Sequence, residues 1–193
     1  MSSQGVRSSS VAKGQSVCPW QHVRLFDNFI RPLLHNTKAM VGRYVRDGMT
    51  ALDVGCGKGF ASLGLARLVG KSGLIIAADL QPEMLEMVRD RAEKAGLSDR
   101  IQTHLCQADC IGVHRRVDFV LAFWMVHEVP DTHAFLKEVF CLLKPGGHFL
   151  IAEPRFHVSR NDFERTLKQA QSVDFKVVCM PFVVLSRAVV LAK

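Results

Sequence analysis

Glycines and a carboxylate follow one short apolar segment at a spacing that could hold a ligand. The apolar segment 50–54 ends in the motif Asp53-Val-Gly55-Cys56-Gly57-Lys58-Gly59, in which the glycines occupy alternate positions. A glycine-rich loop between a strand and a helix lets backbone N–H groups approach a ligand closely. The loop alone does not identify that ligand, because dinucleotides and other adenosine ligands are all bound by such loops.

Two features of this loop argue against a dinucleotide. The dinucleotide pattern requires Gly or Ala at its sixth position, which Phe60 occupies here, and a bulky ring would obstruct close helix–strand packing. The Asp53 carboxylate would repel a pyrophosphate but would suit a ligand that carries an ammonium group. The loop therefore disfavours a nicotinamide-dependent dehydrogenase.

Two further aspartates follow later apolar segments. Asp79 lies twenty residues beyond Gly59, where an acidic side chain can accept hydrogen bonds from both ribose hydroxyls. The alternative role for Asp79 is a helix N-cap before Pro82. Asp109 could accept a hydrogen bond from an adenine amino group, or it could be an ordinary turn residue.

The elements that must position these residues alternate between strand and helix. Strands are predicted at 50–54, 74–78, 101–106, 118–123 and 148–152, helices at 60–69, 82–95, 131–142 and 160–171, and two last strands near 175–179 and 187–191. This alternation predicts an α/β fold with a parallel sheet and right-handed crossovers, closed by an antiparallel pair. In such folds the ligand lies beyond the carboxyl ends of the strands.

Taken together, these motifs resemble the class I S-adenosylmethionine-dependent methyltransferases. The resemblance covers residues 48–154 and rests on the segments 52–59, 78–85, 108–109, 118–121, 126–131 and 142–147. It is strongest toward the small-molecule branch that includes the quinone-biosynthesis methyltransferases. Two departures are that His127-Glu128 stands where the family often has His-His, and that a sizeable insertion after the fifth strand is missing. The second departure argues against a quinone precursor as the acceptor.

The resemblance implies a seven-stranded, mostly parallel Rossmann-like sheet with an antiparallel last strand and helices on both faces. It also implies the cofactor S-adenosyl-L-methionine, which leaves as S-adenosyl-L-homocysteine. By position, the methionine end of the cofactor would be lined by Asp53, Gly55, Cys56, Gly57, Lys58 and Gly59. Asp79 would hold the ribose, with Leu80 and Met84 near the adenosine; Ala108, Asp109 and Cys110 would flank adenine; Phe123 and Trp124 would face the sulfonium.

His127 is the candidate catalytic residue, because an imidazole with an ordinary pKa near 6.5 suits a general base for a protic acceptor. The alternative is that His127 packs and hydrogen-bonds so as to orient the acceptor pocket. The spacing of His104, Cys106, Cys110 and His114 matches no common zinc pattern, so no metal site is predicted.

The segment before the first strand is predicted to have two parts. Residues 1–16 are rich in Ser, Gly and Gln without an apolar stretch, which predicts a flexible tail rather than a secretory signal. Residues 17–47 contain an amphipathic helical pattern, interpreted as a lid over the cofactor. The alternative is that this segment only packs on the outer helices. Residues 48–193 are then the methyltransferase domain.

Composition narrows the class of protein. The chain has 193 residues, of which 48% are hydrophobic and 22% charged, which fits one globular domain and excludes a disordered chain. No apolar run approaches the roughly 18 residues that a membrane span needs. The six cysteines include no CxxC pair, which favours a reduced, cytoplasmic setting.

The net charge of +7 is concentrated outside the central segment and permits anionic partners, including RNA, without demonstrating any. The sequence therefore predicts a methyltransferase acting on an unidentified small molecule. The alternatives are an RNA or protein methyltransferase, or a non-catalytic S-adenosylmethionine-binding domain. The oligomeric state cannot be predicted from the chain.

Overall fold

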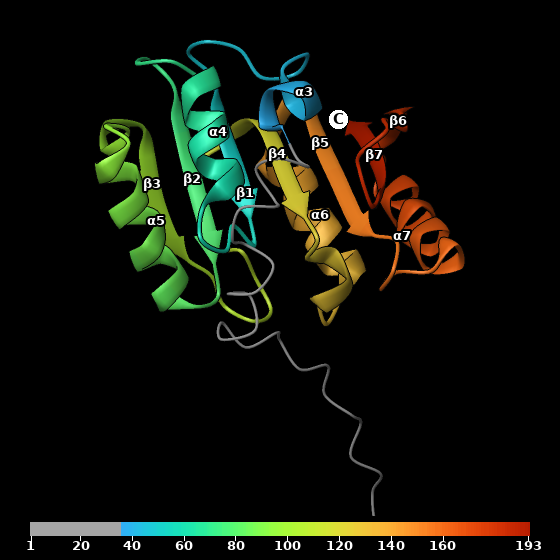
Figure 1. Ribbon diagram of the computed structural model, residues 1–193. Coiled ribbons are helices and arrows are strands. Elements are labelled where there is room, and N and C mark those ends of the chain that lie inside the picture. Colours follow the sequence, from blue (N-terminus) through green and yellow to red (C-terminus); the bar gives the residue numbers. More distant parts are fainter. Residues whose placement is uncertain (1–35) are drawn as a thin grey trace, which may run out of the picture.

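A seven-stranded sheet forms the centre of the computed structural model, which describes residues 36–193 (Figure 1). The strands are β1 Thr50–Val54, β2 Leu74–Asp79, β3 Ile101–Leu105, β4 Val117–Phe123, β5 Leu143–Pro154, β6 Lys176–Cys179 and β7 Ser186–Ala192. Their order is β3-β2-β1-β4-β5-β7-β6, and the first five strands are parallel. Because β7 pairs antiparallel with both β5 and β6, the predicted sheet and its antiparallel last strand are confirmed.

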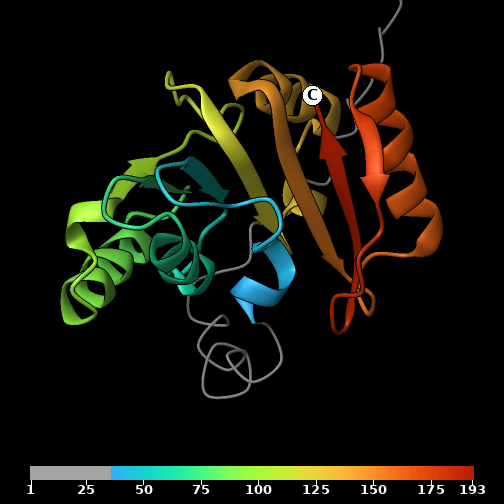
Figure 2. The same cartoon turned by 90° about the horizontal axis from the view of Figure 1, so that it is seen from above.

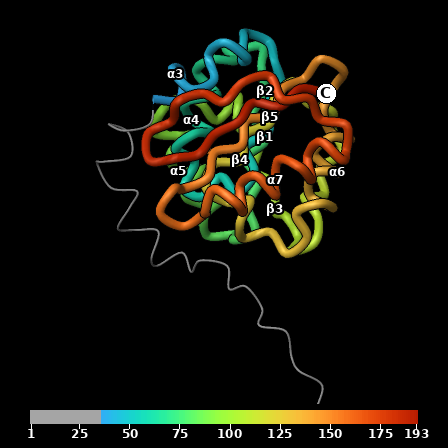
Figure 3. The backbone as a smooth tube through the Cα atoms, turned by 90° about the vertical axis from the view of Figure 1, so that its right-hand side faces the viewer, coloured from blue at the N-terminus to red at the C-terminus, as the bar shows by residue number. Residues whose placement is uncertain are grey.

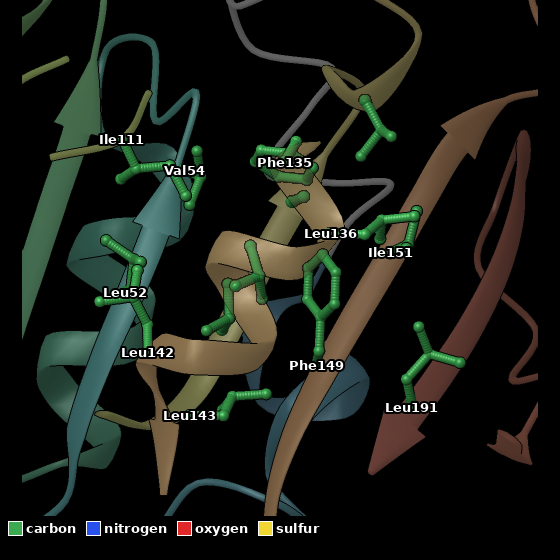
Figure 4. Close-up of a cluster of buried hydrophobic side chains, with 14 of the residues drawn as sticks. Leu52, Val54, Ile111, Phe135, Leu136, Leu142, Leu143, Phe149, Ile151 and Leu191 are labelled. Carbon is green, nitrogen blue, oxygen red and sulfur yellow. The ribbon is translucent and has the colours of Figure 1, made fainter. Parts of the chain in front are cut away.

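Helices cover both faces of the sheet (Figures 2 and 3). They are α3 Thr37–Val41, α4 Phe60–Leu68, α5 Pro82–Lys94, α6 Thr132–Leu142 and α7 Arg160–Ser172, with 3-10 turns η1 Ser98–Arg100 and η2 Val126–Glu128. Side chains of α3 and α4 pack with Phe119 and Leu121 on one face. Side chains of α6 pack with Phe149 and Ile151 on the other face (Figure 4), and those of α7 belong to the same buried cluster. Strands buried on both faces explain the nearly continuous apolar runs in the sequence.

The ends of the helices follow local sequence signals. Asp131 caps α6 by accepting a 2.9 Å hydrogen bond from the Ala134 N–H, and Ser159 caps α7 in the same way. The N-cap of α5 is Gln81, with Pro82 in the first turn, so the alternative role of Asp79 as that cap does not apply.

One predicted boundary was wrong. The fifth strand was expected to begin at His148 after a Pro-Gly-Gly loop, but β5 begins at Leu143, directly after α6. Leu143 pairs with Val117 at the start of β4, and the register shifts before Phe119 pairs with His148. Pairing with a neighbouring strand, which local turn propensity does not report, extends β5 through the glycines.

Only part of the predicted lid can be described. Its residues 17–35, and the whole predicted tail, lie outside the described residues. The described part contains α3, which packs on α4 where Gly64 allows a close approach: a Cβ atom there would lie 2.4 Å from the Thr37 hydroxyl oxygen. None of the helices within 36–193 is long and apolar enough to cross a membrane.

Candidate cofactor and acceptor site

The glycine loop after β1 requires glycine for two separate reasons. Gly55, Gly57 and Gly59 have φ values of 64°, 51° and 77°, in the left-handed region that other residues rarely adopt. A Cβ atom on Gly55 would lie 2.8 Å from Met125 Cγ, and one on Gly59 would lie 2.9 Å from Val88 Cγ2. Side chains are therefore excluded at both ends of the loop, while Gly57 faces open space.

Asp79, at the end of β2, fixes the middle of this loop. Its Oδ2 accepts a 2.8 Å hydrogen bond from the Gly57 N–H, and its Oδ1 accepts a 3.0 Å hydrogen bond from the Gln81 N–H. Burial raises the pKa of Asp79, although backbone N–H groups at Gln81, Gly57 and Leu80 oppose that shift. Since a carboxylate can accept about four hydrogen bonds, Asp79 keeps capacity for ribose hydroxyls while it holds the loop.

A narrow pocket lies between this loop, α3 and α4. It is lined by Met40, Asp53, Gly55, Cys56, Phe60, Ala61 and Phe123. The carboxylate of Asp53 is almost fully buried and accepts a 2.5 Å hydrogen bond from the Ser62 hydroxyl. The pocket therefore brings together four predicted cofactor residues from the ends of β1 and β4, and Ser62 is a member of the site that the sequence analysis missed.

Cys56 and Lys58 contribute to the loop in different ways. Burial, followed by the charges of Asp53 and Asp79, raises the pKa of the Cys56 thiol well above its ordinary value, so the thiol stays protonated at neutral pH and is not a nucleophile. The Lys58 carbonyl accepts a 2.9 Å hydrogen bond from the Arg91 guanidinium of α5. This contact ties the loop to the neighbouring helix.

The residues predicted near the adenosine are dispersed around the edge of the sheet. Ala108, Asp109 and Cys110 are exposed on the loop after β3, in a turn closed by a 3.0 Å hydrogen bond from the Gln107 N–H to the Cys110 carbonyl. Leu80 is 38% exposed beyond β2, whereas Met84 is buried on α5. Leu80 and the turn are therefore accessible to a ligand, whereas Met84 is covered by its neighbours and can affect a ligand only indirectly.

Glu138 of α6 positions the loop after β3. Its carboxylate oxygens accept 2.9 Å hydrogen bonds from the N–H groups of Ile111 and Gly112, and Gly112 is left-handed with φ 72°. His104 Nε2, on β3, lies 2.8 Å from the Ile111 carbonyl oxygen and makes a second hydrogen bond to this loop. The sequence contained no local signal for this role, because Glu138 lies in the middle of a helix, 27 residues from Ile111.

We expect Glu138→Gln to weaken S-adenosyl-L-homocysteine binding about threefold to tenfold, because a glutamine amide can accept only one of the two N–H groups well. Calorimetric titration measures the change. Glu86→Gln, at an exposed position on α5, is the matched control and should retain the wild-type affinity. An unchanged affinity for Glu138→Gln would show that the loop does not contribute to the cofactor site.

His127 and Glu153 form a pair at the ends of β4 and β5. The Glu153 carboxylate is 2% exposed, accepts a 2.9 Å hydrogen bond from the Val126 N–H, and is hydrogen-bonded to His127 Nδ1. Burial lowers the pKa of His127, but the hydrogen bond and charge of Glu153, with the charge of Glu128, outweigh it and raise that pKa overall. The His157 ring lies 4.7 Å from the His127 ring, centroid to centroid.

Trp124 occupies a strained turn between the narrow pocket and β7. Its φ of 61° is left-handed, which is unfavourable for a bulky residue, and it is held by a 2.7 Å hydrogen bond from its N–H to the Ala152 carbonyl. The indole N–H donates to the Ser186 hydroxyl at 2.8 Å. Phe123 stacks on the indole at 5.2 Å, and Phe156 meets it edge-on at 5.6 Å. Only Phe123 of the predicted aromatic pair lines the narrow pocket.

Metal ligands are not grouped in the described part of the chain. Among residues 36–193, no set of three or more His, Cys, Asp or Glu side chains is arranged to hold a metal ion. His104, which the sequence analysis considered together with Cys106, Cys110 and His114, instead contacts a backbone carbonyl.

The chain matches a family model described as methyltransferase domain over residues 45–181. It is 28% identical over 135 residues to the ubiquinone/menaquinone biosynthesis C-methyltransferase UbiE of Cronobacter sakazakii, an alignment that covers 69% of this chain and 52% of that protein. It is 34% identical over 110 residues to UbiE of Cellvibrio japonicus, covering 56% and 44% respectively. The chain thus spans about half the length of these curated relatives.

A solved structure shares the fold over nearly the whole chain. The crystal structure of a SAM-dependent methyltransferase from Aquifex aeolicus superposes with a TM-score of 0.79 at 21% identity, covering 91% of this chain and 98% of that one. At this identity the likeness concerns the fold, and it agrees with the strand order and the antiparallel β7 described above.

Proposed function

The chain belongs to the methyltransferase domain family, and from this premise we propose that it transfers a methyl group from S-adenosyl-L-methionine to a small-molecule acceptor. The observation that carries the proposal is the coupling of the glycine loop to the end of β2. The Gly57 N–H donates to Asp79, so one carboxylate both shapes the loop and faces the edge where a ribose would lie. The resemblance seen in the sequence is confirmed at the level of the family.

The residues fit this cofactor better than a dinucleotide. The loop allows no Cβ at Gly55 or Gly59, as a backbone cradle requires, and the buried Asp53 places negative charge beside it. We assign Asp53, Gly55, Cys56, Gly57, Lys58, Gly59 and Phe123 to the methionine end, Asp79 and Leu80 to the ribose, and Ala108, Asp109 and Cys110 to adenine. We assign Met84 only a packing role, because it is buried on α5, and we assign Trp124 to the positioning of Phe123, on which it stacks.

S-adenosyl-L-methionine supplies an electrophilic methyl group on a sulfonium. The chain's own contribution is mainly to align the acceptor and exclude water, which can supply on the order of 7–11 kcal/mol. The face of Phe123 adds about 0.5–2 kcal/mol of attraction for a nearby cation. Positioning therefore accounts for most of the expected rate enhancement.

His127 is proposed to take the proton of a protic acceptor. Glu153 holds Nδ1, which leaves Nε2 as the nitrogen that can accept the proton. The Glu153 carboxylate also stabilises the imidazolium that forms. This arrangement favours the general-base role of His127 over a purely packing role, and Glu153 is the partner that the sequence analysis did not assign.

The acceptor is proposed only as a small molecule. The names of the UbiE relatives refer to ubiquinone and menaquinone biosynthesis, but this chain spans about half of their length. A cytoplasmic setting is proposed from the cysteines: Cys56, Cys106, Cys110, Cys141 and Cys179 are free thiols in the described structure, as reducing compartments maintain.

The proposal is tested by combining cofactor titration with a transfer assay. Calorimetry with S-adenosyl-L-homocysteine should show saturable binding, and NAD at the same concentrations should show none. Labelled methyl groups are then followed from S-adenosyl-L-methionine into a panel of phenols, amines, carboxylates and thiols, with total RNA and a protein extract as separate arms. Binding of NAD instead would contradict the proposal. Label found only in RNA or only in protein would show that the acceptor is a macromolecule and not a small molecule.

A further inference from the structure

A second pocket opens at the opposite edge of the sheet, where β1, β4 and β5 begin. It is open to solvent, with an empty volume of about 610 Å³ that includes this open space, and its charged and aromatic lining residues are Arg43, Tyr44, Arg46, Asp118, Lys144 and His148. We call it the basal pocket. Asp118 and Phe123 lie at opposite ends of β4, so a ligand here would be remote from the methyl-transfer site.

The lining of the basal pocket carries a net positive charge. Its one carboxylate, Asp118, is compensated by Lys144 Nζ at 2.8 and 2.9 Å and by the Thr50 N–H at 2.9 Å. Arg43 and Arg46 are exposed, and within residues 36–193 neither guanidinium has an ion pair or a hydrogen bond. Within the described part of the chain, two guanidinium groups at this pocket are therefore available to an anion.

The floor of the pocket adds neutral hydrogen-bonding groups. The Tyr44 and His148 rings are in contact, with their centroids 5.0 Å apart, and Tyr44 also stacks on the buried Phe119. The Tyr44 hydroxyl lies 3.2 Å from Cys179 Sγ. This hydrogen bond and burial raise the pKa of Tyr44, and the charge of Arg43 opposes that shift. Burial lowers the pKa of His148, so its ring is neutral near pH 7 and offers an N–H group.

Backbone geometry keeps the pocket open at the turn before the main part of β5. Gly146 is left-handed with φ 76°, and a Cβ atom there would meet nothing within 4 Å. At Gly147 a Cβ atom would lie 2.9 Å from the Lys144 carbonyl oxygen and 3.0 Å from that of Asp118, so no side chain can fill the space from this position.

We propose that the basal pocket binds the phosphate group of an anionic ligand, at a site separate from methyl transfer. Guanidinium groups match phosphate oxygens with paired hydrogen bonds, and the exposed position of both arginines keeps the desolvation cost of binding low. The phosphate can be free or can belong to a small phosphorylated molecule. The segment that carries Arg43 and Arg46 follows α3, whose Met40 lines the cofactor pocket.

The test is calorimetric titration of the full chain at constant ionic strength, with inorganic phosphate and glycerol 3-phosphate in separate arms and glycerol as the uncharged control. We expect saturable binding of at least one phosphate probe. The double variant Arg43→Gln/Arg46→Gln should weaken it about tenfold or more. Tighter binding of glycerol 3-phosphate than of inorganic phosphate would identify a small phosphorylated molecule, and equal binding would identify free phosphate.

A matched variant separates a specific site from general charge attraction. Arg160→Gln/Arg165→Gln removes the same charge from exposed positions on α7 and should change phosphate affinity less than about twofold. Amide NMR shifts on phosphate addition should be confined to residues around Gly146 and His148. Equal weakening by both double variants, no binding of either phosphate probe, or shifts centred on the glycine loop would overturn the proposal.

The experiment is independent of the proposed activity. S-adenosyl-L-homocysteine affinity is measured on the same variants and should be unchanged by Arg43→Gln/Arg46→Gln. Failure of phosphate binding with intact cofactor binding would refute the basal pocket alone. Failure of cofactor binding in the wild-type chain would refute the proposed function alone.

Discussion

Asp79→Ala is expected to weaken S-adenosyl-L-homocysteine binding by more than about tenfold, because two charge-assisted hydrogen bonds to the ribose would be lost. The structure adds a second reason, since Asp79 also holds the Gly57 N–H at the centre of the glycine loop. Losing the acceptor costs about 1–3 kcal/mol of stability for each backbone N–H group left buried and unpaired, against a total stability of about 5–15 kcal/mol for a folded domain. Calorimetry measures the affinity and thermal denaturation the stability.

Two further variants separate the roles of Asp79. Asp79→Asn keeps one oxygen that can accept from the loop, so it should lose less stability than Asp79→Ala while still losing ribose binding. Asp90→Ala removes an exposed carboxylate from α5 and should leave the affinity unchanged. A dissociation constant for Asp79→Ala that equals the wild-type value in a folded protein would exclude the ribose role.

His127→Ala is expected to lower kcat about 100-fold or more for a protic acceptor, the usual contribution of a positioned general base, while leaving S-adenosyl-L-homocysteine affinity close to wild type. The measurement is the initial rate of methyl transfer to an acceptor found in the panel. His133→Ala, at an exposed position on α6, is the matched control and should retain full activity. A change in KM with kcat preserved would instead assign His127 to positioning of the acceptor.

The pH dependence tests the same pair from another direction. A base works in its deprotonated form, so kcat should fall as the pH decreases through the pKa of His127, which the structure raises above the usual 6.5. Glu153→Gln removes the hydrogen-bonded charge but leaves the burial that lowers the pKa, so the midpoint should move to lower pH. NMR titration of the His127 ring measures that pKa directly, and a midpoint that stays in place would rule out Glu153 as its cause.

The sequence predicted the parts of this fold that depend on local chemistry. The apolar runs of β2 and β4 and the glycines after β1 each report the conformation of their own segment. Strand–helix alternation then allows few topologies, because crossovers between parallel strands are right-handed. The family resemblance followed from the order of these local motifs along the chain.

The site needed contacts that local patterns do not contain. Glu153 meets His127 across 26 residues, Glu138 meets Ile111 across 27, and Ser186 meets the Trp124 indole across 62. The first and third pairs form because parallel and antiparallel pairing brings strand ends to one edge of the sheet, whereas the second forms because α6 packs beside the loop after β3. The basal pocket arises in the same way at the other edge.

What the sequence determined by itself is therefore the order of elements, the glycine loop and the aspartates that follow the strands, since each depends on residues close in the chain. Tertiary structure alone decided which carboxylate supports His127, which helix holds the loop after β3, and which guanidinium groups line the basal pocket. Those outcomes depend on distances between strands and helices, which are set only when the sheet assembles and buries its two faces.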